Sequence, residues 1–132
     1  MDCPRLFVYG TLRRSFQNVY AKLLSENSTF LGPARIRGRL YRIRDYPGVT
    51  LTPEAEEWVI GELFELRDPA PTLATLDEYE GCNRVDQPPE FVRVLTTATM
   101  VGGVTLSSWV YIYKGPIVPE NRIFSGDFLT PA

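Results

Sequence analysis

Residues 91–113 read FVRVLTTATMVGGVTLSSWVYIY, and this stretch indicates the fold class most directly. β-branched and aromatic residues dominate both of its halves, and Gly102 and Gly103 stand between them. Adjacent glycines supply the positive φ angles that a tight hairpin turn needs. The pattern therefore predicts a hairpin with strands at Phe91–Met100 and Thr105–Tyr113.

Two further segments have the character of strands. Residues 6–9 form a short apolar run that stops at Gly10, which is typical of a buried strand entering a loop. Residues 57–66 (EWVIGELFEL) alternate between two faces. The segment Asp45–Val49 (DYPGV) contains the residues of a turn.

Residues 34–40 also alternate, with Arg35, Arg37 and Arg39 on one face of the predicted strand. The apolar positions change parity after Leu40, which predicts a bulge or bend close to that residue. The arginine face has two interpretations. It is a solvated face whose charges pair with acids elsewhere, or it is a surface for RNA or phosphate.

Helical spacing is confined to two segments. Residues 18–24 fit a short helix with Asn18 as its cap, and Val19, Tyr20, Leu23 and Leu24 form its apolar face. Residues 69–81 fit a second helix that Gly81 stops. Together with the strands, this predicts an α+β fold: one domain over residues 1–132, with a small β-barrel and one or two helices.

The composition excludes several classes of site. The chain has 132 residues, no histidine and two cysteines, with a net charge of −2. Without histidine, neither a Ser-His-Asp triad nor a Cys-His pair is available, and two cysteines do not make a four-thiolate zinc site. We expect no metal and no cofactor. Proton transfer then falls to a carboxylate, a tyrosine, a cysteine, Lys22 or Lys114.

Partners and location follow from the same composition. The slightly negative charge gives no argument for nucleic acid or an anionic membrane as the main partner. No signal peptide and no apolar run long enough to span a bilayer is present. We expect a cytoplasmic protein, monomeric or weakly dimeric. A disulfide between Cys3 and Cys82 stays open at this stage.

Two segments are candidates for chemistry. In Tyr9–Arg13 (YGTLR), a strand ends in glycine, so successive N–H groups are free either to form an anion-binding nest or simply to turn the chain. In Leu76–Gly81 (LDEYEG), three acids crowd a helix C-terminus, where the helix dipole disfavours negative charge. Asp77 and Glu78 are interpreted as solvated surface. Glu80 is either part of the same surface or a candidate acid/base.

Three aromatic residues share one face of the last predicted strand: Trp109, Tyr111 and Tyr113. Cross-strand packing accounts for most such residues. Tyr113, at the end of the strand, is the one that we expect to reach a ligand.

Four segments, taken together, resemble the γ-glutamylcyclotransferase-like family, which includes γ-glutamylamine cyclotransferase and the plant avirulence-induced proteins. They are FVYGTLR at 7–13, YPG at 46–48, LDEYEG at 76–81 and VYIY at 110–113. Their order and spacing match over most of the chain. Thr11 resembles the γ-glutamylamine branch, since the glutathione-specific branch tends to carry serine there.

The resemblance implies a small mixed β-barrel with flanking helices, and a site for a small γ-glutamyl substrate. The backbone of Tyr9, Gly10, Thr11 and Leu12 is implied to hold the α-carboxylate of that substrate. Glu80 matches the catalytic carboxylate of the family. Tyr113 matches a pocket tyrosine, and Tyr46 is expected to line the cavity.

The implied reaction suits a chain without histidine, because the substrate carries its own nucleophile. The α-amine of a γ-glutamyl group attacks its own γ-carbonyl, 5-oxoproline forms and an amine or amino acid leaves. Glu80 is expected to move the proton. The competing hypothesis is a non-catalytic small-molecule binding or stress-response module that uses the same cavity, because a fold does not guarantee turnover.

Overall fold

The computed structural model describes residues 3–14, 16–51, 56–81 and 89–130. The elements, in chain order, are β1 (Arg5–Val8), α1 (Val19–Glu26), β2 (Ser28–Arg37), β3 (Arg39–Arg42), β4 (Pro47–Thr50), β5 (Trp58–Leu66), α2 (Pro69–Tyr79), β6 (Phe91–Met100), β7 (Thr105–Tyr113) and the 3₁₀ turn η1 (Pro119–Asn121).

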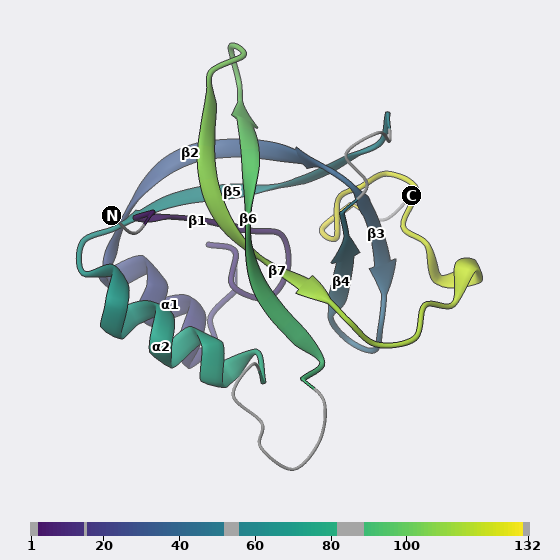
Figure 1. The fold of residues 1–132 in the computed structure, drawn as a ribbon, viewed down its shortest axis with the longest axis horizontal. Coiled ribbons are helices and arrows are strands. Elements are labelled where there is room, and N and C mark those ends of the chain that lie inside the picture. Colours follow the sequence, from purple (N-terminus) through teal and green to yellow (C-terminus); the bar gives the residue numbers. More distant parts are fainter. Residues whose placement is uncertain (1–2, 15, 52–55, 82–88, 131–132) are drawn as a thin grey trace.

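Five strands close into a barrel in the order β1-β5-β2-β6-β7 (Figure 1). The short strand β1 closes it, because it pairs antiparallel with β5 and parallel with β7, where Leu6 lies beside Trp109. Strands β3 and β4 form a separate two-stranded sheet. The predicted α+β barrel with flanking helices is confirmed.

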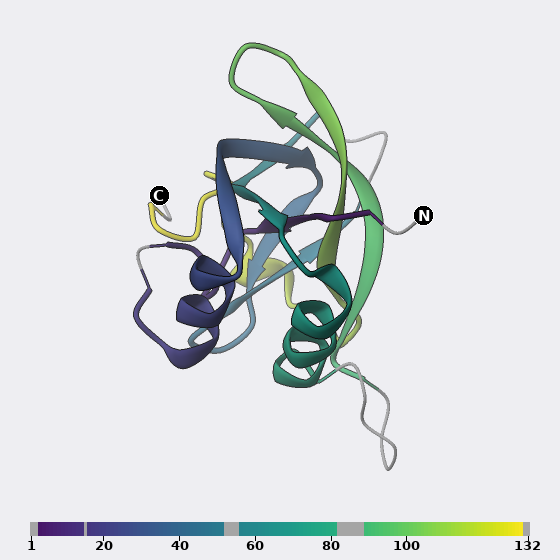
Figure 2. The same cartoon turned by 90° about the vertical axis from the view of Figure 1, so that its left-hand side faces the viewer.

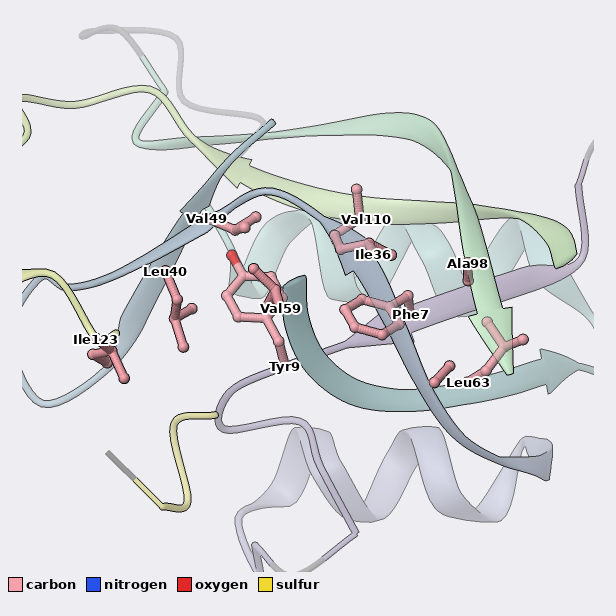
Figure 3. Packing of buried hydrophobic residues seen from close by; sticks show 11 residues of the cluster. Phe7, Tyr9, Ile36, Leu40, Val49, Val59, Leu63, Ala98, Val110 and Ile123 are labelled. Carbon is pink, nitrogen blue, oxygen red and sulfur yellow. The ribbon is translucent and has the colours of Figure 1, made fainter. Parts of the chain in front are cut away.

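The apolar residues form two cores, one on each face of the barrel wall. Inside the barrel, Phe7 packs with Ile36, Leu63 and Val110, as Figure 3 shows. Outside it, helices α1 and α2 lie beside each other and cover a second core that includes Leu6 (Figures 1 and 2). Successive residues of β1 therefore enter different cores, which explains why its sequence is a continuous apolar run.

The local predictions that rest on turns and caps are confirmed. Strands β6 and β7 have the expected bounds, and Gly102 and Gly103 have φ angles of 96° and 93° at the turn between them. The Asn18 side chain caps α1 by accepting a hydrogen bond from the Ala21 N–H. Helix α2 ends at Tyr79, and Gly81 follows with a φ of 78°.

The strand predicted over residues 34–40 is longer and is interrupted at Gly38 instead of near Leu40. The chain leaves β5 at this point and pairs with β4 as β3. A Cβ atom at position 38 would lie 2.7 Å from the carbonyl oxygen of Thr50, so the crossing requires glycine. The predicted bend exists, but steric contact with the backbone sets its position.

Two local predictions are wrong. Residues 45–49 are not all turn: the turn ends at Tyr46, and Pro47–Thr50 is strand β4, which pairs with β3. Val19 was placed on the apolar face of α1, but it is 76% exposed, since its position in the first turn lies away from the barrel. Local periodicity alone does not determine which strand β4 pairs with, or whether the side chain of Val19 faces the barrel.

On the arginine face, Arg35 and Arg37 are exposed, as the alternation indicates, and Arg39 is half-buried. Arg35 and Arg37 stack on the Trp58 ring, with guanidinium carbons 3.9 and 4.0 Å from the ring centroid. Glu57 forms ion pairs with Arg39 and with Arg122. The arginines of this face therefore contact the indole of Trp58 and the carboxylate of Glu57 within the same chain, as the first of the two interpretations expects for charges that pair with acids.

Cys3 is a free thiol. Cys82, the other residue of the disulfide left open above, lies outside the described residues. None of the helices in the described part of the chain is long and apolar enough to cross a membrane.

Candidate active site

The loop that follows β1 is a tight turn with free amide groups. The Arg13 N–H donates to the Gly10 carbonyl at 3.1 Å and closes the turn. The N–H groups of Gly10, Thr11 and Leu12 find no acceptor among the described residues. The Asn18 side chain, which caps α1, also donates to the Thr11 carbonyl at 2.7 Å. One residue thus fixes both the loop and the start of the helix.

Arg13 anchors the other end of this loop in a network of charges. Its side chain is buried, at 8% exposure, and its Nη1 lies 2.8 Å from Asp127 Oδ1. Its Nε lies 3.5 Å from Glu62, and the other oxygen of Glu62 accepts the Arg14 N–H at 2.8 Å. Buried charges hold their positions when they are paired in this way. The loop is therefore clamped to β5 and to the C-terminal segment.

Gly10 is required for space, not for an unusual backbone angle. Several glycines of the described chain have a positive φ, but Gly10 does not. A Cβ atom at this position would lie 2.9 Å from two ring carbons of Pro47. The β1 loop and the start of β4 are therefore in direct contact, which brings Tyr46 next to the loop.

Glu80 lies at the C-cap of α2, where it follows the last helical residue and precedes Gly81. The Glu80 side chain accepts no hydrogen bond from a described residue. Its carboxyl group is largely buried, although part of the residue faces the cavity. Burial, followed by the charges of Glu90 and Asp77, raises the pKa of Glu80 from 4.5 to about 8. A carboxyl group in this state exchanges protons near neutral pH.

Asp77 is not the solvated acid that the sequence suggested. Its carboxylate receives Arg93 Nε at 2.8 Å and Nη2 at 3.1 Å, and the Tyr111 hydroxyl at 2.7 Å. Burial and this hydrogen bond raise the pKa of Tyr111 well above its ordinary value. The interpretation of Asp77 as surface was wrong because its partners come from β6 and β7, which the sequence did not place beside α2. Glu78 is exposed, as expected.

A second carboxylate, from Glu90, lies just before β6. The Tyr46 hydroxyl donates to Glu90 Oε1. Burial and this bond to Glu90 raise the pKa of Tyr46 to about 12. No sequence pattern marked Glu90, which is a single acid after two prolines.

A cavity of about 320 Å³ brings these groups together. Residues 7–12, Tyr46, Tyr79, Glu80, Glu90 and Tyr111 line it, with the exposed Arg44 and Asp45 at its rim. The expected neighbourhood of Glu80 and the Gly10–Leu12 amides is therefore present. Among the described residues, no three histidine, cysteine, aspartate or glutamate side chains are arranged to hold a metal ion.

The structure places all but one of the predicted site residues on this cavity. Tyr113 does not line it: its ring packs against Phe91 at 5.4 Å and against the backbone of Gly48 and Gly115. Tyr111 lines the cavity instead. The sequence put both tyrosines on the same face and gave no signal for choosing between them, since the choice depends on where along β7 the cavity opens.

The sequence of the chain matches a known protein family. The family model described as "Gamma-glutamyl cyclotransferase, AIG2-like" matches residues 6–130, and the chain belongs to this family. The chain is 32% identical over 126 residues to the γ-glutamylcyclotransferase family protein YtfP of Escherichia coli K12, covering 95% of this chain and 96% of that protein.

Another relative comes from Niallia circulans and is named γ-L-glutamyl-butirosin B γ-glutamyl cyclotransferase. It is 33% identical over 121 residues, which cover 90% of this chain and 72% of that protein. Against YkqA of Bacillus subtilis, the sequence match covers only 21% of the relative's length.

Solved structures show the same fold. An AIG2-like protein from Mus musculus superposes with a TM-score of 0.71 at 21% identity, covering 97% of this chain and 89% of that one. YkqA superposes with a TM-score of 0.71 at 26% identity, but this chain spans only 39% of it. The barrel described above is thus the fold of the family.

Proposed function

We propose that this protein is a γ-glutamyl cyclotransferase, which releases 5-oxoproline and a free amine or amino acid from a γ-glutamyl amine or γ-glutamyl peptide. The observation that carries the proposal is the cavity that Glu80 shares with Gly10, Thr11 and Leu12, whose amides have no acceptor in the described part of the chain. The family membership of the chain supports the same reaction class. The Niallia circulans relative, whose printed substrate is γ-L-glutamyl-butirosin B, supports a γ-glutamyl substrate.

The amide loop is suited to the anionic end of the substrate. Its three N–H groups have no acceptor among the residues that the structure describes, so a carboxylate binds there without displacing a hydrogen bond to one of these residues. Holding the α-carboxylate at the loop brings the α-amine towards Glu80. This folds the chain of the substrate into the compact form from which the ring closes.

The chemical step moves two protons in succession from the α-nitrogen to the leaving nitrogen. Ionised Glu80 takes a proton from the α-ammonium, and the freed amine attacks the γ-carbonyl carbon. A carbon–nitrogen bond forms, and the bond to the leaving nitrogen breaks as Glu80 returns the proton to that nitrogen. Glu80 then takes the second proton from the ring nitrogen, which leaves the neutral lactam, and passes it to the departing amine. The atoms balance without water or an enzyme nucleophile. Loop amides not used by the α-carboxylate stabilise the negative charge that develops on the γ-oxygen.

The test is a panel of γ-glutamyl amines and dipeptides, with 5-oxoproline as the measured product. Glu80→Gln is expected to reduce kcat by about 10² to 10⁴. In the wild type, kcat/KM is expected to rise with pH along a limb with an apparent pKa near 8, because the base must be ionised. Undiminished turnover by Glu80→Gln contradicts the mechanism. Saturable binding without turnover supports the non-catalytic binding module instead.

A further inference from the structure

Glu90 is a carboxylate of the cavity to which the reaction above gives no role. It lines the same cavity as Glu80, and its charge is the strongest electrostatic influence on that residue after burial. The two carboxyl groups therefore share one cavity, where the charge of Glu90 acts on Glu80. Since like charges disfavour each other when they are desolvated, this pair is costly in the empty site once both groups are ionised.

The position of Glu90 is fixed from two sides. Its carbonyl oxygen accepts the Lys114 N–H at 2.8 Å, which ties it to the end of β7. Its Oε1 accepts the Tyr46 hydroxyl, which comes from the turn between β3 and β4. Among the described residues, no donor reaches its second oxygen. One oxygen is thus held and the other is available to a ligand.

The protein supplies little positive charge to balance this pair. Arg44 is the cationic side chain among the described lining residues, and it is exposed at the rim. Arg93 lies behind the site, where it binds Asp77. The other titratable groups that act on the pair are acidic or phenolic: Asp45, Asp77, Tyr9, Tyr46, Tyr79 and Tyr111. A ligand with a compact positive charge therefore relieves the repulsion between Glu80 and Glu90.

We propose that Glu90 is a substrate-binding carboxylate that, together with Glu80, receives the α-ammonium group of the γ-glutamyl moiety. The inference rests on the proposed function for the identity of the ligand. An ammonium carries three N–H donors, so it can donate to both carboxylates at once. When Glu80 removes one proton, the remaining bond to Glu90 holds the amine with its lone pair turned towards the γ-carbon. Glu90 itself gains and loses no proton.

The decisive experiment compares two ligands that differ only in the α-ammonium: L-glutamine and glutaramic acid. Calorimetry on the wild type is expected to show tighter binding of glutamine by about 10- to 100-fold, the range for hydrogen bonds to a charged group. Glu90→Gln is expected to bring this ratio close to one while the affinity for glutaramic acid is retained. Glu120→Gln, which removes an exposed charge on η1, is the matched control and keeps the wild-type ratio.

Kinetics give a second readout. Glu90→Gln is expected to raise KM for a γ-glutamyl amine by about 10-fold or more, and to lower the apparent pKa of the rising pH limb, because Glu90 raises the pKa of Glu80. Tyr46→Phe keeps the charge of Glu90 but frees Oε1, so we expect a smaller change of the ligand ratio in the same direction. This variant decides the question if Glu90→Gln does not fold.

The outcomes separate this inference from the proposed reaction. A wild type that does not distinguish glutamine from glutaramic acid overturns the role of Glu90, as does a Glu90→Gln variant that weakens both ligands equally. A wild type that forms no 5-oxoproline from any γ-glutamyl compound overturns the cyclotransferase proposal, while the binding ratio still decides whether Glu90 recognises the ammonium.

Discussion

The hydroxyl of Tyr9 donates a hydrogen bond of 2.6 Å to the carbonyl oxygen of Tyr111. The side chain of Tyr111 in turn donates to Asp77, which lies three residues before Glu80 on α2. One residue of β7 therefore contacts both halves of the candidate site: the amide loop through Tyr9 and the acid through Asp77. The spacing between loop and acid is set by the barrel wall.

Tyr111→Phe tests this arrangement. The change leaves the ring and the bond from Tyr9 in place and removes one of the donors to Asp77. We expect kcat to fall by about 10-fold, with a smaller change in KM, and the free energy of unfolding to fall by about 1–3 kcal/mol. Steady-state kinetics and urea unfolding measure the two effects.

Tyr20→Phe is the matched control for Tyr111→Phe. Its ring stacks on Tyr79 at 4.2 Å, but its hydroxyl makes no hydrogen bond with a described residue. It is expected to retain wild-type kcat and stability. Equal losses in both variants would show that the Tyr111–Asp77 bond has no special role.

The raised pKa of Glu80 makes stability depend on pH. Below about pH 4.5 the carboxyl group is protonated in both the folded and the unfolded chain, and it contributes no difference. Between 4.5 and about 8 the unfolded chain ionises while the folded chain keeps its proton, so the free energy of unfolding falls as pH rises. Above about 8 the cost is constant. Each pKa unit corresponds to about 1.4 kcal/mol.

Glu80→Gln removes this contribution. We expect the variant to be more stable than the wild type at pH 9 and to differ less from it at pH 4. Urea unfolding across this range measures the difference between the two curves. A constant difference between them would contradict a raised pKa in the folded protein.

Gly10→Ala is expected to damage the site through contact with Pro47. The added Cβ atom meets two Pro47 carbons at 2.9 Å, so the loop or the start of β4 must move. We expect activity to fall by about 10-fold or more, because a displacement of about 1 Å costs up to 10²-fold, and stability to fall by about 1–3 kcal/mol. Kinetics with a γ-glutamyl amine and thermal unfolding measure these losses.

Gly102→Ala separates the effect of space from that of backbone conformation. A Cβ atom there meets nothing within 4 Å, but the φ of +96° is unfavourable for alanine. This control is expected to lose about 1–2 kcal/mol of stability and to keep its activity. If Gly102→Ala lost as much activity as Gly10→Ala, the contact with Pro47 would not explain the loss.

Asp127→Asn tests the clamp on Arg13. It preserves the shape of the side chain but leaves the buried guanidinium with Glu62, at 3.5 Å, as its charged partner. We expect KM to rise several-fold more than kcat falls, because the amide loop is held less firmly, and stability to fall by about 1–3 kcal/mol. Arg39→Gln breaks an exposed ion pair and is expected to change stability by less than about 1 kcal/mol.

The features that the sequence predicted well are those that neighbouring residues determine. The Gly102–Gly103 turn joins strands that lie next to each other, and Gly81 ends α2 by its own positive φ. The amide loop and Glu80 were candidates because each is marked locally, by a glycine after a strand and by an acid at the wrong end of a helix. Their roles were implied by the resemblance to the family and not by these local marks.

The remaining features depend on pairings between distant segments. The local sequence predicts a solvated Asp77, whereas in the structure Arg93 and Tyr111, from β6 and β7, donate hydrogen bonds to its carboxylate. Glu90 acquires its surroundings from Tyr46, 44 residues away, and no periodicity reports such a contact. The position of β1 between β5 and β7 is likewise a property of barrel closure, not of the apolar run itself.

That position of β1 has a consequence for how the protein is made. The strand that carries the amide loop is synthesised before β7, and the Tyr9–Tyr111 bond joins residues 102 positions apart. Until β7 has left the ribosome, the apolar run of β1 has only one of its two neighbours and its hydrophobic side chains lack cover. Contacts of such long sequence separation slow folding. The ligand-binding hollow is therefore among the last features to assemble on the nascent chain, and chaperones have time to bind this segment before it closes.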